Sequence, residues 1–430
     1  MKALVSYPGT GEFAQQVALA FHEANALDIF VTTFGVRSDG PVLRVLKALP
    51  TSFAGASRRS LLRRHLDIVP ADCLHFRPAL EILRTAAGQL GSTPRVTDAI
   101  WDLMSHDFTR HVASRVRRRR PTAVYAYEYT AKEAFDAATV SGAIRVLDLP
   151  SLSSRGLQGV LACEAERFPA LRADDDRYFV RRFARRQARR DAEIAQADLI
   201  VCNSTITRNS HVAQGADADR IIVVPLAAPP TISAVVETRE SSPLHLIWAG
   251  TFGVRKGAHY LIEACRGFRP VAVRIDVFGA ITLPNSILEG LPKCLNFHGS
   301  VPRDQLFREF EAADALIFPT LSDGFGMVVT EAFSRGLPVI TTNRAGAADL
   351  VRHGENGLII PAHDSRAIVE SIEWCLDNRR CLASMRLSAL ATAKARQWPD
   401  YRRELIAALD GGLRNRGFPA SLLSTSYRES

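Results

Sequence analysis

Short apolar runs rich in β-branched residues alternate with longer helical patterns along most of this chain. Each run is bounded by turn residues, which is typical of a strand buried on both faces of a sheet. In the first half the predicted strands are 3–6, 29–33, 123–127, 144–147, 199–202 and 221–224. Helical segments such as 13–24 and 179–196 separate them. This alternation predicts an α/β fold with a parallel sheet covered on both faces.

A proline-rich stretch from 225 to 243 has no clear period and interrupts the alternation at mid-chain. The alternation then restarts, with predicted strands at 245–249, 271–278, 295–298, 315–318, 339–341 and 357–360. We therefore expect two doubly wound domains of similar size. Open α/β sheets bind ligands outside the carboxyl ends of their strands, so the cleft between the domains is the expected site.

The C-terminal region is predicted to be helical. Helical patterns at 365–377 and 379–396 follow the last predicted strand, and Pro399 marks a break or kink before one more helix. The final residues have no period, and we expect 417–430 to be a mobile tail.

Length and composition agree with a two-domain cytoplasmic protein. A chain of 430 residues with 47% hydrophobic content can build two large cores. Met1 and Lys2 lead directly into an apolar strand, so we expect no signal peptide. No apolar stretch approaches the roughly 20 residues that span a bilayer. The seven cysteines form no C-x-x-C pair, and we expect reduced, mostly buried thiols.

The net charge of +9 comes with arginine clusters at 58–66, 115–121 and 181–191. A basic surface suits phosphate-rich partners such as nucleic acid, anionic lipid or a sugar-phosphate acceptor. The alternative is a set of solvated arginine-rich helix faces without a partner. The sequence leaves both interpretations open.

Residues 247–264, "IWAGTFGVRKGAHYLIEA", carry the first candidate chemistry. A strand ends at Gly250, and a short loop then presents Arg255 and Lys256 before a helix begins near Gly257. Glycines allow close backbone approach to a ligand, and two adjacent cations suit a diphosphate. No Ser or Thr follows the lysine, so this is not a Walker A loop. A surface loop with two solvated cations is the alternative.

Residues 322–340, "SDGFGMVVTEAFSRGLPVI", follow a buried strand and a proline. Gly324 and Gly326 free backbone amides before a helix N-terminus, which favours an anion or a polar oxygen. Asp323 can accept hydrogen bonds from sugar hydroxyls, and Glu331, about one turn into the helix, can reach a ribose diol. The alternative is that Asp323 forms an Asx turn and Glu331 is an ordinary helix residue.

Several linked motifs resemble the retaining, nucleotide-sugar-dependent glycosyltransferases of family 4 (glycosyl transferases group 1). They are "PTLSDGFGMVVTEAFSRGLPV", Lys256-Gly257, "AGAADLVRHGENGLII", "ADLIVCNS" and "WPDY". The resemblance is dense from about 245 to 410 and sparse before 195. It implies the GT-B fold, with two Rossmann-like domains, a cleft between them and a C-terminal crossing helix. The implied boundaries are 1–230, 231–395 and 396–416 for the acceptor domain, the nucleotide-sugar domain and the crossing helix.

The resemblance also implies roles for particular residues. Lys256 would hold the donor diphosphate, Glu331 the ribose and Asp323 the transferred sugar. The rest of the implied site consists of strand-end, loop and helix-start residues: Gly250, Thr251, Gly324, Phe325, Gly326, Met327 and Val328 at the donor, and Gly9 and Gly11 across the cleft.

The chain departs from the family pattern at three positions. Asp323 stands where the family has glutamate, and Thr251 replaces an arginine, for which Arg255 is the candidate substitute. Asp148 stands where the family often has a histidine that bonds to the donor sugar, so we take it as a catalytic candidate. Tyr127 and Glu128, at the end of the preceding strand, are further cleft candidates.

Three tempting signals are set aside. "GTGEFA" follows a strand as in dinucleotide-binding proteins, but the strand at 29–33 ends without the acid that would bind a ribose. The acidic run at 174–176 is interpreted as a helix start rather than a metal site, and the histidines lack ligand spacing. We expect neither a metal nor a cofactor.

The sequence thus predicts a metal-independent enzyme that moves a hexose from a nucleoside diphosphate sugar to a saccharide or lipid-linked acceptor with retention. Polysaccharide, lipopolysaccharide or glycolipid synthesis would be its setting, in the cytoplasm or at an anionic membrane face. One rival is a non-catalytic partner subunit that binds a nucleotide sugar. The other is a nucleic-acid-binding protein, but this sequence contains no recognisable nucleic-acid-binding module.

Overall fold

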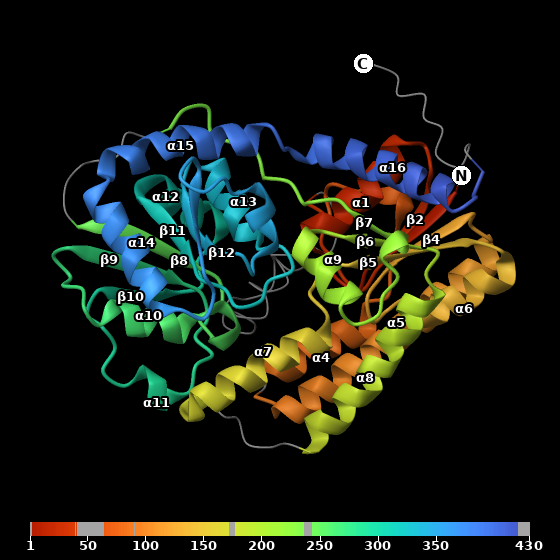
Figure 1. The fold of residues 1–430 in the computed structure, drawn as a ribbon. Coiled ribbons are helices and arrows are strands. Elements are labelled where there is room, and N and C mark those ends of the chain that lie inside the picture. Colours follow the sequence, from red (N-terminus) through yellow and green to blue (C-terminus); the bar gives the residue numbers. More distant parts are fainter. Residues whose placement is uncertain are drawn as a thin grey trace.

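The computed structural model describes residues 2–38, 40, 64–89, 91–171, 177–235 and 243–419. Two α/β domains lie side by side, with the N-terminal one on the right of Figure 1 and the second on the left. The acidic run at 174–176, the tail from 420 and residues 58–63 of the first arginine cluster fall outside the described residues.

The first domain contains a seven-stranded parallel sheet in the order β3-β2-β1-β4-β5-β6-β7. Its strands are β1 Ala3–Ser6, β2 Leu27–Thr32, β3 Leu74–Phe76, β4 Ala123–Tyr127, β5 Ile144–Leu149, β6 Leu199–Cys202 and β7 Ile221–Val223. Its helices are α1 Glu12–Glu23, α4 Ala79–Gln89, α5 Pro94–Arg119, α6 Lys132–Ser141, α7 Ser154–Arg167, α8 Arg177–Gln196 and α9 Thr205–Val212, with short 3₁₀ turns η1 Ala71–Cys73, η2 Pro169–Leu171 and η3 Ala218–Arg220.

The second domain contains a six-stranded parallel sheet in the order β10-β9-β8-β11-β12-β13. Its strands are β8 Leu244–Ala249, β9 Val273–Phe278, β10 Leu295–Gly299, β11 Ala315–Phe318, β12 Val339–Thr342 and β13 Gly357–Ile360. Its helices are α10 Ala258–Cys265, α11 Asn285–Leu288, α12 Arg303–Ala312, α13 Met327–Ser334, α14 Ser365–Asp377 and α15 Arg379–Lys394, with 3₁₀ turns η4 Val254–Lys256 and η5 Gly346–Leu350.

The two sheets share one topology, because each begins in the middle, winds outward on one side and then crosses to the other. This is the doubly wound order of Rossmann-like domains. The predicted α/β class with two such domains is therefore confirmed. The predicted strands agree with the observed ones to within about two residues at their ends, and the one omission is β3.

The C-terminal helix α16, Trp398–Asn415, returns to the first domain along the top of Figure 1. Arg402 on this helix pairs with Glu23 at 2.7 Å and donates to the Gln16 side chain at 2.7 Å, both on α1. Pro399 lies in the first turn of α16, where a missing N–H costs nothing, so it starts the helix rather than kinking it.

Two general expectations can be compared with the described residues. All seven cysteines are free thiols, and five of them are buried. None of the helices in the described part of the chain has the length and apolarity needed to cross a bilayer.

Candidate active site

The carboxyl ends of both sheets face the junction between the domains. In each sheet the chain reverses its winding beside the first strand, between β1 and β4 in one domain and between β8 and β11 in the other. Loops that leave neighbouring strands in opposite directions at such a point form a crevice. Figure 1 shows the two domains on either side of this junction.

A cavity of about 250 Å³ lies at this junction and is lined by both domains. The first domain contributes Phe13, Pro150, Asn203 and Leu226, and the second contributes Ala249, Gly250, Lys256, Phe318, Asp323, Phe325, Gly326, Met327 and Val328. The cavity therefore joins the lysine loop after β8 to the glycine loop after β11. These are the two loops that the sequence singles out.

Lys256 and Asp323 form an ion pair inside this cavity, and the lysine ammonium also lies 4.7 Å from the centre of the Phe318 ring. Burial lowers the pKa of Lys256, whereas the Asp323 carboxylate acts in the opposite direction. Gly257 has φ 77°, and a Cβ there would lie 2.1 Å from the Pro319 carbonyl oxygen. Only glycine fits at this position, so the lysine loop is pressed onto the end of β11.

The glycine loop is docked against the first domain. A Cβ on Gly324 would lie 2.2 Å from the Pro150 carbonyl oxygen, so this contact also requires glycine. Ser204 and Thr207 of the first domain donate hydrogen bonds to the Gly324 carbonyl at 2.6 and 2.9 Å. Gly326 has φ 85° and is followed at once by α13, whose N-terminal amides favour an anion.

The segment from Arg344 to the start of η5 is hydrogen-bonded to the same loop. Asp323 donates its backbone N–H to the Arg344 carbonyl at 3.0 Å, and Gly346 donates to the Asp323 carbonyl at 3.0 Å. Asp323 is therefore fixed on both sides of its peptide unit. This explains why "AGAAD" follows the glycine loop in sequence and in space.

Glu331 lies on α13 outside the cavity lining and is ion-paired with Arg303 at 3.0 Å. Burial raises the pKa of Glu331, and the Arg303 guanidinium opposes this shift. Arg303 also pairs with Glu12 of the first domain at 2.9 Å. The ribose role implied for Glu331 remains a prediction, and Arg303 bridges its carboxylate to the first domain.

Asp148 is not among the residues that line the cavity. Its side chain is 6% exposed and accepts a hydrogen bond of 2.5 Å from the Tyr125 hydroxyl, on the face of the sheet that packs against α1 and α16. Burial raises its pKa to about 7. Asp148 thus lies in the packed layer between the sheet and these helices, and its catalytic role remains a prediction.

The other first-domain candidates surround the cavity rather than line it. Tyr127 is buried behind Phe13, with ring centres 5.7 Å apart. Gly9 accepts a hydrogen bond from the Thr32 hydroxyl at 2.6 Å, and a Cβ on Gly11 would lie 2.6 Å from the Phe13 ring. Gly11 thus makes room for Phe13, one of the lining residues that sequence reasoning missed.

Thr251 and Arg255 are exposed on the second domain and do not line the cavity. The backbone carbonyl of Arg255 accepts from the Leu321 N–H at 2.9 Å, so the backbone of Arg255 rather than its guanidinium supports the site. Of the lining residues in the described ranges, Lys256 is the one cation.

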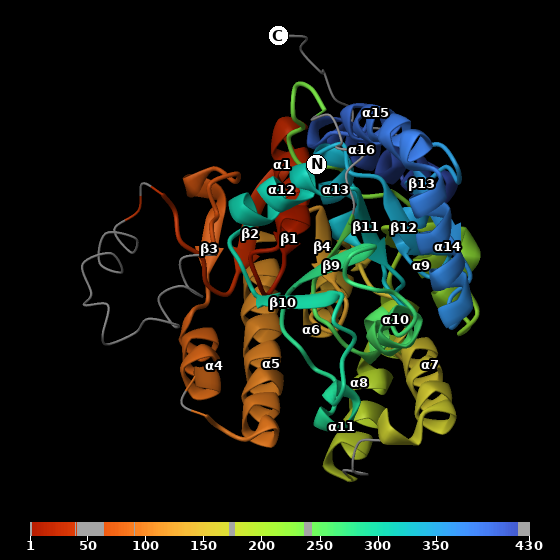
Figure 2. The same ribbon diagram turned by 90° about the vertical axis from the view of Figure 1, so that its left-hand side faces the viewer.

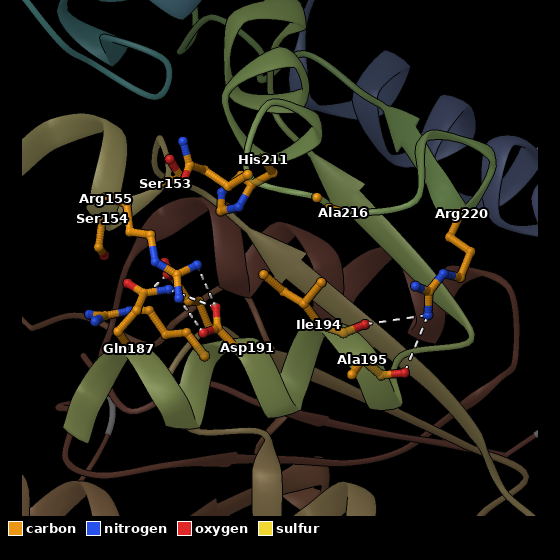
Figure 3. A pocket seen from close by; sticks show the side chains of 14 residues that line it. Ser153, Ser154, Arg155, Gln187, Asp191, Ile194, Ala195, His211, Ala216 and Arg220 are labelled. Atoms are coloured by element: carbon orange, nitrogen blue, oxygen red, sulfur yellow. Dashed lines mark hydrogen bonds and ion pairs between the residues drawn. The ribbon is translucent and has the colours of Figure 1, made fainter. Parts of the chain in front are cut away.

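Glu128 lies in a different cavity, of about 330 Å³, between α7, α8 and α9 (Figure 3). It pairs there with Arg190 at 2.9 Å, while Arg155 pairs with Asp191 at 2.6 Å. Arg220 donates to carbonyl groups at the end of α8, including that of Ala195 at 3.3 Å. Because these cations already have partners, the lining does not form an anion site.

The arginine cluster at 181–191 is used largely within the protein. Arg182 and Arg186 pair with Asp98 and Asp102 of α5, at 2.8–3.0 Å. Arg189 pairs with Glu133. These pairs favour a structural role for this cluster over a phosphate-rich partner.

Residues 243–378 match the family described as "Glycosyl transferases group 1". The D-inositol 3-phosphate glycosyltransferase of Nocardia farcinica is 26% identical over 244 residues, covering 51% of this chain and 54% of that protein. The amylovoran biosynthesis glycosyltransferase AmsK of Erwinia amylovora is 25% identical over 188 residues, covering 40% of this chain and 46% of that protein. The chain thus spans about half the length of the relatives it matches.

Solved structures show the fold. Anabaena HepE in complex with UDP superposes with a TM-score of 0.61 at 17% identity, covering 96% of this chain and 100% of that one. The lipopolysaccharide outer core galactosyltransferase WaaB superposes with a TM-score of 0.59 at 13% identity, covering 96% and 99%. The GT-B fold predicted for the whole chain is confirmed.

Proposed function

We propose that the protein is a retaining hexosyltransferase that uses a nucleoside diphosphate sugar, because residues 243–378 match the group 1 glycosyl transferases and the whole chain has the GT-B fold. The observation that supports this most is the cavity between the domains, where Lys256, the glycine loop and the start of α13 converge. A buried cation beside a helix N-terminus is suited to the donor diphosphate. The acceptor, a saccharide or a lipid-linked saccharide, would enter from the first domain.

The proposed chemistry requires charge stabilisation more than a general base. As the bond between sugar and diphosphate breaks, negative charge develops on the leaving phosphate, where Lys256 and the α13 amides would stabilise it. The departing diphosphate can take the proton of the acceptor hydroxyl. In this proposal Lys256 supplies the positive charge and no metal takes part. Asp323, now paired with Lys256, would be released to contact sugar hydroxyls once the diphosphate occupies the lysine.

The docked glycine loop gives a reason for the two-domain arrangement. Gly324 contacts Pro150, so the donor loop is completed only when the domains are together. Such closure excludes water from the reacting bond and suppresses hydrolysis of the donor. Catalysis is therefore a better account of this cleft than a non-catalytic partner subunit.

The first test is calorimetric titration of the purified protein with UDP, GDP and ADP. HepE was solved with UDP and with UDP-glucose, which makes UDP the first candidate. Lys256→Ala should weaken binding by about tenfold or more, since charge-assisted hydrogen bonds contribute roughly 1.5–3 kcal/mol. The exposed Lys293→Ala is the matched control and should bind like the wild type. A folded protein that binds none of the three nucleotides would contradict the proposal.

We further propose that the protein is cytoplasmic and docks at an anionic membrane face. Five large apolar side chains are exposed on the consecutive elements β3, α4 and α5 of the first domain: Phe76, Ile82, Leu83, Val96 and Leu103. Apolar insertion together with a basic protein charge is the combination that binds anionic lipid surfaces.

Flotation with phosphatidylcholine vesicles, with and without phosphatidylglycerol, tests this at low salt. The protein should float only with the anionic vesicles, and Leu83→Ser with Leu103→Ser should reduce the floated fraction severalfold. Leu387→Ser, at an exposed position of the second domain, serves as the control. A protein that stays in the aqueous fraction with both kinds of vesicle would refute membrane docking.

A further inference from the structure

Arg303 joins the two domains through a pair of carboxylates. It is the first residue of α12, and its Nη1 lies 2.9 Å from Glu12 Oε2 at the start of α1. Its Nη2 lies 3.0 Å from Glu331 Oε1 on α13. One guanidinium therefore holds a carboxylate of each domain, and the three helices gather at the top of Figure 2.

The helices that carry the two carboxylates also contribute to the inter-domain cavity. Glu12 precedes the lining residue Phe13 on α1, and Glu331 is three residues after the lining residue Val328 on α13. Residues three apart on a helix share a face. The Glu12–Arg303–Glu331 bridge thus connects the helix that carries Phe13 with the helix that carries Val328.

The charges around Glu331 explain what Arg303 does there. Burial raises the pKa of Glu331, and the Glu12 carboxylate raises it further, whereas Arg303 lowers it. Arg303 and Glu12 are the charged groups that face Glu331 from the neighbouring helices α12 and α1. Arg303 is therefore the group that opposes the upward shift of this pKa and favours the ionised carboxylate.

We propose that Arg303 is a positioning residue for the nucleoside of the donor, an inference that rests on the proposed function. It holds Glu331 ionised and engages Oε1, which leaves Oε2 to accept hydrogen bonds from the ribose diol. Through Glu12 it links this acceptor to the first domain, so that ribose binding and domain closure favour one another. Lysine could not replace it fully, because two separate N–H groups contact the two carboxylates.

The experiment measures nucleotide affinity between pH 5.5 and 8.5 for the wild type, Arg303→Gln, Arg303→Lys and Glu12→Gln. The nucleotide is whichever of UDP, GDP and ADP binds best, together with its 2′-deoxy form. Without Arg303 the pKa of Glu331 rises, so Arg303→Gln should lose about tenfold in affinity at the acidic end relative to the alkaline end. It should also discriminate less against the 2′-deoxy nucleotide.

The other variants separate charge from geometry. Arg303→Lys keeps the positive charge and should retain the wild-type pH profile. Glu12→Gln removes the inter-domain contact and also a charge that raises the pKa of Glu331, so its acidic loss of affinity should move to lower pH while the ribose discrimination is retained. Melting temperatures show whether each variant is folded. If Arg303→Gln does not fold, the pH profile of Arg303→Lys still tests the inference.

Three results would overturn the inference. If the wild type binds nucleotide but Arg303→Gln has the same pH profile and the same ribose discrimination, Arg303 is a structural ion pair and only this inference fails. The inference also fails if Arg303→Lys loses the wild-type pH profile. If the folded wild type binds no nucleotide, the proposed function itself fails, and the inference fails with it.

Discussion

A carboxyl group inside a parallel sheet behaves differently from one on a surface, and Asp148 is the example in this chain. Its carboxylate lies between β5 and the α1–α16 layer, bonded to the Tyr125 hydroxyl at 2.5 Å. Burial disfavours the charged form and raises its pKa from 3.8 to about 7. Asp148 occupies the position that the family resemblance assigns to donor-sugar binding, and in this structure its side chain packs in the core.

This environment predicts how stability depends on pH. A group whose pKa is higher in the folded state binds its proton more tightly there, so stability falls as pH rises from about 4 to 7. Asp148→Asn mimics the neutral form and should remove this loss. The difference between variant and wild type should grow by up to about 4 kcal/mol across that range, since each pKa unit corresponds to about 1.4 kcal/mol.

Urea denaturation of both proteins at pH 4.5 and pH 8 measures this difference. Asp148→Asn should also retain nucleotide binding, because the side chain does not line the cavity. If the two proteins lose the same free energy of unfolding between these pH values, the carboxyl group is not buried as described.

At the residue scale, sequence reasoning found side chains of the site but not the contacts between them. Lys256 and Asp323 were each identified from a loop motif, yet they are 67 residues apart and their pairing depends on the order of strands. Arg303 carried no signal, because a lone arginine at the start of a helix is common. Phe13 and Pro150 escaped notice because ordinary apolar residues become lining only when two domains meet.

At the scale of elements, the pattern of apolar runs predicted nearly the whole fold. Both sheets are parallel and buried on two faces, so their strands are continuously apolar and easily recognised. The exception is β3, which has three residues and a burial pattern that fades from Leu74 to Phe76. β3 lies at the edge of its sheet and pairs with one strand instead of two. An edge strand is less buried than a central strand, so β3 lacks the continuous apolar run that marks the other strands.

The loops show the limit of the same reasoning. Glycines were expected after β11 because a ligand needs backbone amides, and the structure adds a second cause. Gly324 and Gly346 lie at contacts with the first domain or with each other that no Cβ could enter. A glycine in the sequence indicates a position where a side chain can be excluded, but the sequence does not show which neighbouring residue excludes it.

For the whole molecule, the question is what holds the two domains at this angle. Besides the glycine loop, Arg303 and α16, the helix α7 reaches from the first domain under the second (Figure 1). Its Glu164 is 2% exposed and accepts hydrogen bonds from His259 and His363 of the second domain, each at 2.7 Å. Tyr260 donates a third at 3.2 Å. His259 is three residues after Lys256, so this contact supports the helix behind the donor loop.

Burial alone would raise the pKa of Glu164, but the hydrogen bonds from His259, His363 and Tyr260 outweigh it and hold the pKa below its usual value. Stability from this group is therefore present at neutral pH and is lost on acidification below the usual range of a glutamate. His363 adopts φ 65°, a left-handed conformation that is strained for a histidine. The second domain thus presents this imidazole to Glu164 at a cost in local backbone energy.

Replacing Glu164 by glutamine should loosen the arrangement of the domains without unfolding either one. The amide keeps the shape but loses the charge that two imidazoles contact, which should weaken the junction by roughly 1–3 kcal/mol. Small-angle scattering of the free protein should then show a larger radius of gyration, and saturating nucleotide should reduce that difference. Glu166→Gln, two residues along α7 and exposed, is the matched control and should scatter like the wild type. If Glu164→Gln also scatters like the wild type, the Glu164 carboxylate does not set the angle between the domains, and other inter-domain contacts hold the cleft, such as the glycine loop, Arg303 and α16.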